Sequence, residues 1–255
     1  MTKYRYSILT YIINNYEKVH EIENKKDDVE YILVTDTKEI VSETWEVKYV
    51  ENPYPNDPFW LCYDIRFNPF KYVSSDIVLR IDGSMGICGD TDLLIDKFEK
   101  EQFDMAVSIH PTRNNMYDEY VAWVNCRKYP LSQAEYVLNW MIRTFRYDVK
   151  EYKGLYQYNI CIQRNSKMCN SLNELTLANL KFLAEEGKQI ERIDQTVVSM
   201  ILNIYFSDKK IMTMSDEICN NQIFYWCTHG TDKKMSGCPT HIEPYLFNKP
   251  CKLDF

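Results

Sequence analysis

Short apolar runs alternate with longer amphipathic stretches along most of the chain, and this alternation predicts its main elements. The apolar runs have the length and residue types of buried strands. We predict strands at Tyr6–Ile13, Val29–Asp36, Thr44–Val50, Asp76–Ile81, Phe103–Ile109 and Tyr156–Gln163. Apolar residues at helical spacing predict helices at Tyr16–Lys25, Phe59–Tyr72, Asp90–Gln102 and Ile190–Phe206. Strands that alternate with helices indicate an α/β, Rossmann-like fold with a mainly parallel mixed sheet and helices on both faces.

Two capping-box patterns and a change of composition complete the predicted organisation. Ser132–Glu135 and Ser171–Glu174 match S-x-x-E, which predicts that a helix begins at each serine. From about Asp216 the pattern becomes irregular and rich in Cys, His and Pro. We therefore predict one domain over residues 1–215 and an irregular tail over residues 216–255 on the same domain. The tail is expected to close over a ligand or to pack against a second subunit in a homodimer.

Composition and charge narrow the class of protein. The chain has 255 residues, of which 45% are hydrophobic, and this suits one sizeable domain. Its formal net charge of −7 argues against nucleic acid as a partner. No apolar run approaches the ~20 residues of a transmembrane segment, and the first residues lead into a strand without a signal peptide. Because the nine cysteines contain no C-x-x-C pair, we expect reduced thiols and a cytoplasmic location, including the inner face of the membrane.

Polar residues follow three of the predicted strands. The first strand closes at Thr10–Asn15, the second ends in Asp36, and the segment Asp82–Gly86 follows the strand Asp76–Ile81. Ligands of parallel sheets bind at the carboxyl ends of the strands. We therefore expect these three loops to meet at one crevice.

The segment Asp82-Gly83-Ser84 is the strongest single candidate for chemistry. A carboxylate at a strand end can bind a sugar hydroxyl, or a divalent cation that neutralises a diphosphate. The alternative is an ordinary turn in which Asp82 accepts hydrogen bonds from backbone amides. The glycines at 83, 86 and 89 also allow a loop that cradles a dinucleotide, although the usual fingerprint follows the first strand with another spacing.

Two further groups of polar residues are candidates. After the strand Phe103–Ile109, Arg113 can bind phosphate bidentately, and His110, Asp118 or Glu119 can bind an acceptor hydroxyl or take its proton. The alternative is a solvated acidic loop with one buried histidine. Asp194 and Gln195 can hold sugar hydroxyls, although the helix dipole alone favours acidic residues in a first turn.

Soft metal ligands gather in the tail. They are Cys227, His229, Cys238 and His241, whose spacing lacks the paired-cysteine knuckle of common zinc sites. His229 can instead complete a divalent site with Asp82. The chain has no G-x-S-x-G, H-E-x-x-H or Walker motif, which argues against several classes of hydrolase and kinase.

The order of these segments resembles the nucleotide-sugar glycosyltransferases of the GT-A fold. The segments that carry the resemblance are Thr10–Asn15, Val34–Asp36, Ile81–Ser84, Asp194–Gln195 and His229. The chain resembles more closely a poorly characterised glycosyltransferase-like family with bacterial and plant members. That likeness covers roughly residues 4 to 206 and rests on Tyr31–Asp36, Arg80–Gly83, His110–Arg113, Tyr117–Glu119 and Arg192–Gln195.

The resemblance implies a transferase that uses a nucleotide diphosphate sugar, most simply a UDP-sugar, to extend a glycan or lipid-linked glycan of a surface polysaccharide. It implies that the nucleotide is bound by Thr10, Tyr11, Asn15, Asp36, Arg80 and Asp82. It also implies a site for Mn²⁺ or Mg²⁺ formed by Asp82, Ser84 and His229, and a sugar or acceptor site formed by His110, Arg113 and Gln195.

The chain departs from the family pattern at one position, because Ser84 stands where the second aspartate of Asp-x-Asp is expected. Without a metal, Arg66, Lys71, Arg80 or Arg113 would have to stabilise the leaving diphosphate.

An inverting reaction needs a general base, for which Asp118, Glu119 and Asp194 are the candidates, with Asp194 preferred. A retaining reaction needs none. Two other functional classes stay open: a methyltransferase or dehydrogenase that uses the glycines, and a non-catalytic carbohydrate-binding protein on a transferase fold.

Overall fold

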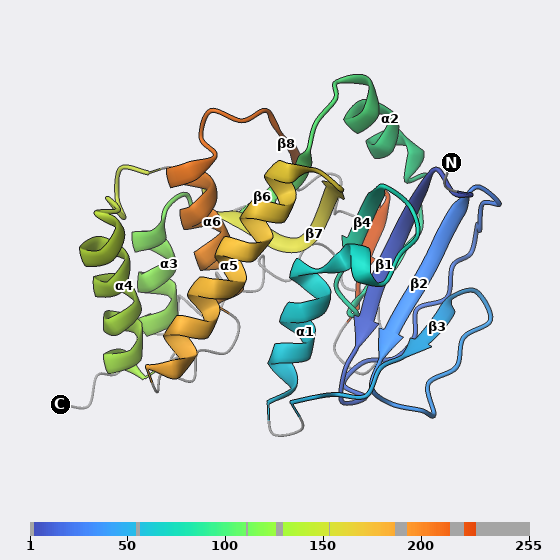
Figure 1. Ribbon diagram of the computed structural model, residues 1–255, viewed down its shortest axis with the longest axis horizontal. Coiled ribbons are helices and arrows are strands. Elements are labelled where there is room, and N and C mark those ends of the chain that lie inside the picture. The colour runs from blue at the N-terminus through green and yellow to red at the C-terminus, as the bar shows by residue number, and fades with distance from the viewer. Residues whose placement is uncertain are drawn as a thin grey trace.

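The protein is built on one mixed sheet (Figure 1). The computed structural model describes residues 3–54, 57–110, 112–125, 130–152, 154–186, 193–214 and 222–227. Its main strands are β1 (Tyr6–Ile12), β2 (Val29–Thr35), β3 (Glu46–Tyr49), β4 (Ile77–Ile81), β6 (Met105–Ile109), β7 (Tyr156–Arg164) and β8 (Ile211–Met214). They form a seven-stranded sheet in the order β3-β2-β1-β4-β7-β6-β8. Since only β7 runs antiparallel to its neighbours in this sheet, the prediction of a mainly parallel α/β sheet is confirmed.

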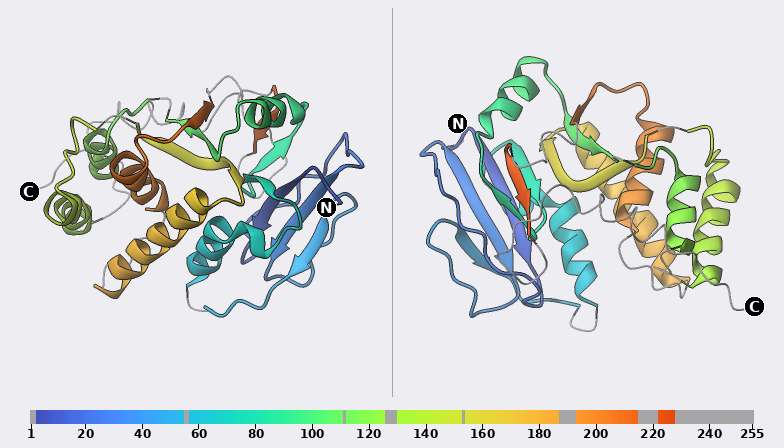
Figure 2. Two further views of the ribbon diagram at one scale, coloured as in Figure 1. Left: turned by 45° about the horizontal axis from the view of Figure 1, so that its top comes forward. Right: turned by 180° about the vertical axis from the view of Figure 1, so that it is seen from behind.

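Helices cover both faces of the sheet, as predicted (Figure 2). The described helices are α1 (Pro58–Phe67), the 3₁₀ turn η1 (Pro69–Lys71), α2 (Asp92–Lys100), α3 (Met116–Asn125), α4 (Leu131–Phe145), α5 (Lys167–Glu185) and α6 (Asp194–Tyr205). On one face, α1 covers β1, β2 and β4, and α5 and α6 cover β6 and β7, with α3 and α4 packed beyond α6. On the other face lies α2, together with a short two-stranded ribbon.

The direction of side chains along β1 decides what can reach the helices. All seven residues of β1 are buried, as expected for a strand covered on both faces. Leu9 and Tyr11 pack towards α1, whereas Ile8 and Ile12 pack towards α2. Because side chains alternate along a strand, Thr10 lies on the α2 side and Tyr11 on the α1 side.

The ribbon joins segments that are far apart in the sequence. It pairs β5 (Met85–Ile87) with β9 (Phe224–Trp226) in antiparallel register, and neither strand was predicted. The glycines beside β5 make this pairing sterically feasible. A Cβ at Gly86 would overlap the Tyr225 ring, and a Cβ at Gly89 would lie 2.8 Å from the carbonyl carbon of Gln222. The space beside these two glycines is therefore filled by Tyr225 and Gln222 of the same chain.

One predicted helix is absent and two predicted helix caps are wrong, each for a physical reason. Residues 16–25 form bends and irregular chain, because tertiary contacts replace the hydrogen bonds of a helix. The Glu21 carboxylate accepts from Thr44 N at 3.0 Å, and the His20 carbonyl accepts from Trp45 Nε1 at 2.9 Å. The helices predicted at the two capping boxes are present as α4 and α5, but neither predicted serine caps its helix. Ser132 follows the first residue of α4, and Ser171 lies inside α5.

The serine that caps α5 is Ser166, whose hydroxyl accepts from Cys169 N at 3.3 Å. The sequence around Ser171 has the same composition as a cap, but the helix has already begun there. A capping box is therefore a local pattern whose meaning depends on where the apolar face of the helix is first buried.

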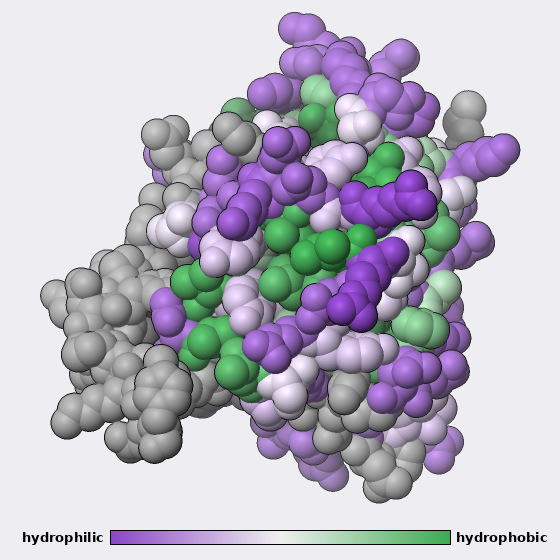
Figure 3. All heavy atoms as spheres, turned by 90° about the vertical axis from the view of Figure 1, so that its left-hand side faces the viewer, coloured by the Kyte–Doolittle hydropathy of each residue, from purple (hydrophilic) through white to green (hydrophobic). Residues whose placement is uncertain are grey.

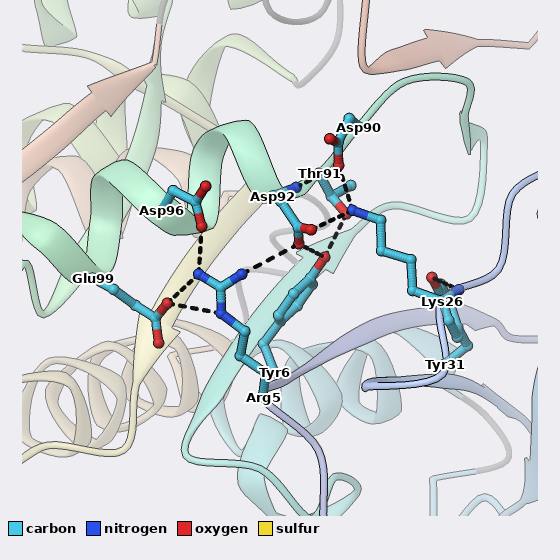
Figure 4. A network of polar contacts seen from close by, with 9 residues as sticks. All are labelled: Arg5, Tyr6, Lys26, Tyr31, Asp90, Thr91, Asp92, Asp96 and Glu99. Carbon is cyan, nitrogen blue, oxygen red and sulfur yellow. Dashed lines mark hydrogen bonds and ion pairs between the residues drawn. The ribbon is translucent and has the colours of Figure 1, made fainter.

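A network of charges joins the start of β1 to α2 at the amino edge of the parallel strands (Figure 4). It contains Arg5, Tyr6, Lys26, Tyr31, Asp90, Thr91, Asp92, Asp96 and Glu99. Arg5 Nη2 donates to Asp96 Oδ1 at 2.5 Å, and Arg5 Nε donates to Glu99 Oε2 at 2.9 Å. The Asp96 side chain is 65% exposed, so this pair is expected to contribute little to stability.

Apolar side chains are also present at the surface. Leu131 and Ile142 of α4 are exposed. A view onto the left-hand side of Figure 1 shows hydrophobic residues in the middle of the face, with hydrophilic residues on either side (Figure 3). Exposed apolar residues are ordinary on protein surfaces, so this face alone does not identify a binding site. In the described part of the chain, every helix is too short or too polar to cross a membrane.

Candidate functional site

The order of the strands locates the first place to search for a ligand. β1 leads to β2 and β3 on one side, whereas β4 lies on the other side of β1. In open α/β sheets such a reversal leaves a crevice at the carboxyl ends of the two strands, where ligands bind. Asp82 directly follows β4, and Asn14 and Asn15 follow the end of β1 by two and three residues. These predicted segments therefore meet at the switch point of the sheet.

The ends of β1 and β2 are tied together by Asp36. Asn14 and Asn15 have φ angles of 58° and 50°, a left-handed conformation that asparagine tolerates better than most residues. This tight turn directs the backbone N–H of Asn14 to Asp36 Oδ1, at 2.6 Å. Asn52 Nδ2 also lies 3.4 Å from Asp36 Oδ2. The loops after β1 and β2 therefore meet through Asn14 and Asp36, one residue before the predicted Asn15.

At the end of β4, Asp82 is the residue on which the other polar groups of the site converge. Its Oδ1 accepts from Tyr11 Oη at 3.0 Å, from Arg66 Nη2 at 2.9 Å and from Arg80 Nη1 at 3.1 Å. No described residue donates a hydrogen bond to its Oδ2. The side chain is 20% exposed. One carboxylate oxygen is therefore fixed by the protein, and the other is available to a hydroxyl donor.

Arg66 connects the two predicted acidic groups. It lies in the last turn of α1, contacts Asp82, and forms short contacts with Asp194 and with the hydroxyl of Tyr11. Burial would lower the pKa of Arg66, but the carboxylates of Asp194 and Asp82 outweigh it and hold that pKa well above its ordinary value. The guanidinium is therefore permanently charged at the carboxyl edge of the sheet.

Arg80 has a different role, because its side chain is only 2% exposed. Its Nη2 donates to the Tyr158 carbonyl at 2.5 Å, and its guanidinium lies 4.7 Å from the centre of the Tyr158 ring. It was expected to bind the nucleotide directly. Instead it is buried beneath Asp82 and orients that carboxylate through the hydrogen bond to Oδ1.

Gly83 brings the turn after β4 against β1. A Cβ at this position would lie 2.5 Å from the Tyr11 carbonyl oxygen and 3.2 Å from Tyr16 Oη. Only glycine allows such an approach. The aspartate at 82 is therefore positioned by a backbone contact as well as by its hydrogen bonds.

Thr10 and Ser84 lie elsewhere. The Thr10 side chain points to the α2 side of the sheet, opposite Tyr11, and its Oγ1 is buried without a hydrogen-bond partner. Ser84 is buried, and its carbonyl accepts from Cys227 N at 2.9 Å, so its backbone belongs to the start of the β5–β9 ribbon.

Of the three candidate bases, only Asp194 reaches Asp82, through their common partner Arg66. Its side chain is 4% exposed. Asp118 instead accepts from Asn114 N at 3.1 Å in the first turn of α3. Glu119 is buried and accepts from Trp123 Nε1 at 2.8 Å.

The predicted acceptor residues form a separate buried group. Arg113 Nε lies 2.6 Å from Glu119 Oε2, and the Arg113 guanidinium contacts the His110 ring. His110 Nδ1 accepts from the backbone N–H of Arg113 at 3.1 Å. His110 follows β6, which is separated from β4 by β7, so this group lies about 10 Å along the same edge from Asp82. Gln195, partly exposed, stands beside Asp194 at the start of α6.

The described residues fit a divalent cation poorly. No three of their His, Cys, Asp and Glu side chains gather as a metal site would require. Asp82 is already paired with two guanidiniums, and like charges about 4 Å apart repel by about 4 kcal/mol per unit charge at an effective dielectric constant of ~20. His229, Cys238 and His241 lie outside the described residues, so the predictions made for them stay predictions.

The glycine loop offers little room for a dinucleotide. A Cβ at any of positions 83, 86 and 89 would overlap the protein itself, namely β1, Tyr225 or Gln222. The glycines of a dinucleotide loop leave space for the pyrophosphate instead. This geometry disfavours the use of the loop by a dehydrogenase or methyltransferase.

Sequence reasoning did not place two residues of the site. Tyr16 was assigned to a helix, yet its hydroxyl lies beside the turn at Gly83. Cys62 lies one turn before Arg66 on α1, and its thiol is influenced by the charges of Arg66 and Asp82. One feature of the sequence points to this side of α1. Arg66 lies close to Leu61 and Ile65, two buried residues on the side of the helix that faces the sheet.

The thiol of Cys62 is predicted to be unreactive in the folded protein. Burial raises its pKa to about 12, against a smaller lowering effect of Arg66, so almost none is thiolate at pH 8. We expect iodoacetamide to modify Cys62 roughly 100- to 1,000-fold more slowly in the native chain than in urea. Mass spectrometry of the Cys62 peptide measures both rates. Equal rates would contradict the raised pKa of this half-buried thiol.

Comparison with known proteins does not assign the chain to a family. No protein-family model matches it, and no curated protein is significantly similar to it in sequence.

Proposed function

We propose that the protein is a glycosyltransferase that takes a sugar from a nucleotide diphosphate donor, in the simplest case a UDP-sugar. The observation that carries the proposal is the position of Asp82 at the β1–β4 switch point. There its Oδ2 is available and its Oδ1 is fixed by Tyr11, Arg66 and Arg80. A site for a sugar nucleotide needs hydrogen-bond acceptors for the sugar hydroxyls and positive charge for the diphosphate. This edge of the sheet offers both.

The GT-A resemblance is supported by which strands carry acidic residues. Asp36 follows β2 and Asp82 follows β4, within a mainly parallel mixed sheet. In the proposed complex the nucleoside lies over the β1–β2 end, near Asn15 and Asp36. Asp82 Oδ2 accepts a hydrogen bond from a hydroxyl of the ribose or of the donor sugar. The diphosphate lies towards Arg66.

The acceptor hydroxyl attacks the anomeric carbon, and the bond from that carbon to the phosphate oxygen breaks. In an inverting reaction Asp194 would take the proton of the hydroxyl, because it is the candidate base beside Asp82 and Arg66. A retaining reaction would need no such base. The proposed acceptor is a glycan or lipid-linked glycan of a surface polysaccharide, made at the cytoplasmic face of the membrane.

Titration of UDP and a panel of UDP-sugars, with and without Mn²⁺, tests the proposal. We expect binding to the wild-type chain and loss of roughly 10- to 100-fold in affinity for Asp82→Asn. The matched control is Asp96→Asn, which changes an aspartate paired with Arg5 at the opposite edge of the sheet. If no nucleotide sugar binds in either condition, the proposal fails.

A further inference from the structure

We infer that Arg66, and not a divalent cation, binds the diphosphate of the donor. This inference rests on the proposed function and assigns the source of positive charge within the same site. Its starting point is the pair of guanidiniums on Asp82, where the resemblance implies a metal. Ser84 supplies no carboxylate for a cation, and its backbone is engaged with Cys227.

The donor groups of Arg66 can be counted. A guanidinium carries five N–H groups. One N–H each of Nε, Nη1 and Nη2 is directed to Tyr11, Asp194 and Asp82, respectively. The remaining N–H of each Nη is not directed at any described residue. The two terminal nitrogens therefore keep a pair of donors, which is the arrangement that binds phosphate oxygens bidentately.

Burial and neighbouring charges make Arg66 suited to this role and Arg80 unsuited. The Arg66 side chain is 18% exposed, so a ligand can reach it, whereas that of Arg80 is 2% exposed. Asp82 and Asp194 hold the Arg66 guanidinium from two sides before any ligand arrives. Such preorganisation places the charge where negative charge grows on the leaving diphosphate.

Titration of UDP and of uridine separates the diphosphate contribution from the nucleoside contribution. For the wild-type chain we expect UDP affinity in EDTA and in Mn²⁺ to agree within about twofold. For Arg66→Met we expect a loss of roughly 10- to 100-fold in UDP affinity, with uridine affinity almost unchanged. Arg66→Lys keeps the positive charge but loses the paired N–H donors of the guanidinium. Its UDP affinity is expected to lie between those of the wild type and Arg66→Met.

The matched control is Arg5→Met, since Arg5 also pairs with acidic residues, namely Asp92, Asp96 and Glu99, but lies at the amino edge. It is expected to leave both affinities unchanged. If Arg66→Met does not fold, Arg66→Lys and the wild-type titration in EDTA still decide the question.

Two results would overturn the inference while leaving the proposed function intact. One is UDP binding that disappears in EDTA and returns with Mn²⁺ or Mg²⁺. The other is equal loss of UDP and uridine affinity in both Arg66 variants. Absence of binding of UDP and uridine in all conditions would overturn the proposed function together with the inference.

Discussion

Replacing Asp82 with alanine is expected to lower the free energy of unfolding by about 3 kcal/mol. The variant leaves Arg80, which is 2% exposed, and Arg66, which is 18% exposed, without the carboxylate that both contact. Arg66 still contacts Asp194 in this variant, but Arg80 is left with a buried charge and no carboxylate partner among the described residues. Such a charge destabilises the folded state by more than the lost pair itself contributed. Urea denaturation followed by circular dichroism measures the change.

The control for this experiment is Asp96→Ala. Asp96 also pairs with an arginine, Arg5, but its side chain is 65% exposed. Loss of such a pair is expected to change the stability by about 0.5 kcal/mol or less. If the two variants are equally stable, Asp82 is not part of a buried charge cluster, and the description of the site is wrong.

The variant Gly83→Ala is expected to lower the stability by about 2 kcal/mol and the UDP affinity by roughly tenfold or more. A Cβ at position 83 would lie 2.5 Å from the Tyr11 carbonyl oxygen, so the turn must move away from β1. That movement separates Asp82 from the hydroxyl of Tyr11. Denaturation and UDP titration on the same samples measure the two effects.

A second substitution identifies which contact is responsible. The same Cβ would lie 3.2 Å from Tyr16 Oη, which Tyr16→Phe removes. Because the closer contact is to backbone, Tyr16→Phe is not expected to rescue Gly83→Ala. Rescue by this change would show that the side chain of Tyr16, and not the close approach of the strands, limits position 83.

The elements with a strong local signal were predictable from the sequence. β1, β2 and β4 are buried along their whole length, and their apolar runs show this directly. The acidic residues Asp36 and Asp82 were placed at strand ends on the same basis. The meeting of these ends at one edge followed from the general rule for parallel sheets.

Other parts of the fold depend on contacts that no local pattern contains. β5 and β9 pair across more than half of the chain, and each is only three residues long. Residues 16–25 have helical spacing, yet their backbone is held by side chains such as that of Thr44. In both cases tertiary contacts outweigh a weak local preference.

The sequence predicted which strand ends form the candidate site, but not which side chains pair with one another there. Arg66 meets Asp82 and Asp194 because α1, β4 and α6 converge, and the sequence does not contain this convergence. Thr10 and Tyr11 were both expected to bind the nucleotide, but neighbouring residues of a strand lie on opposite faces. The packing of α1 shows that Tyr11 is on the face of the site and Thr10 is not. His110, Arg113 and Glu119 proved to be mutual partners.

A crystal structure of the chain with UDP would show directly whether Asp82 and Arg66 belong to the nucleotide site. We predict the diphosphate within hydrogen-bond distance of the Arg66 guanidinium, and the nucleoside over the ends of β1 and β2 beside Asp36. A nucleotide bound at another edge of the sheet, with Asp82 and Arg66 untouched, would contradict this prediction.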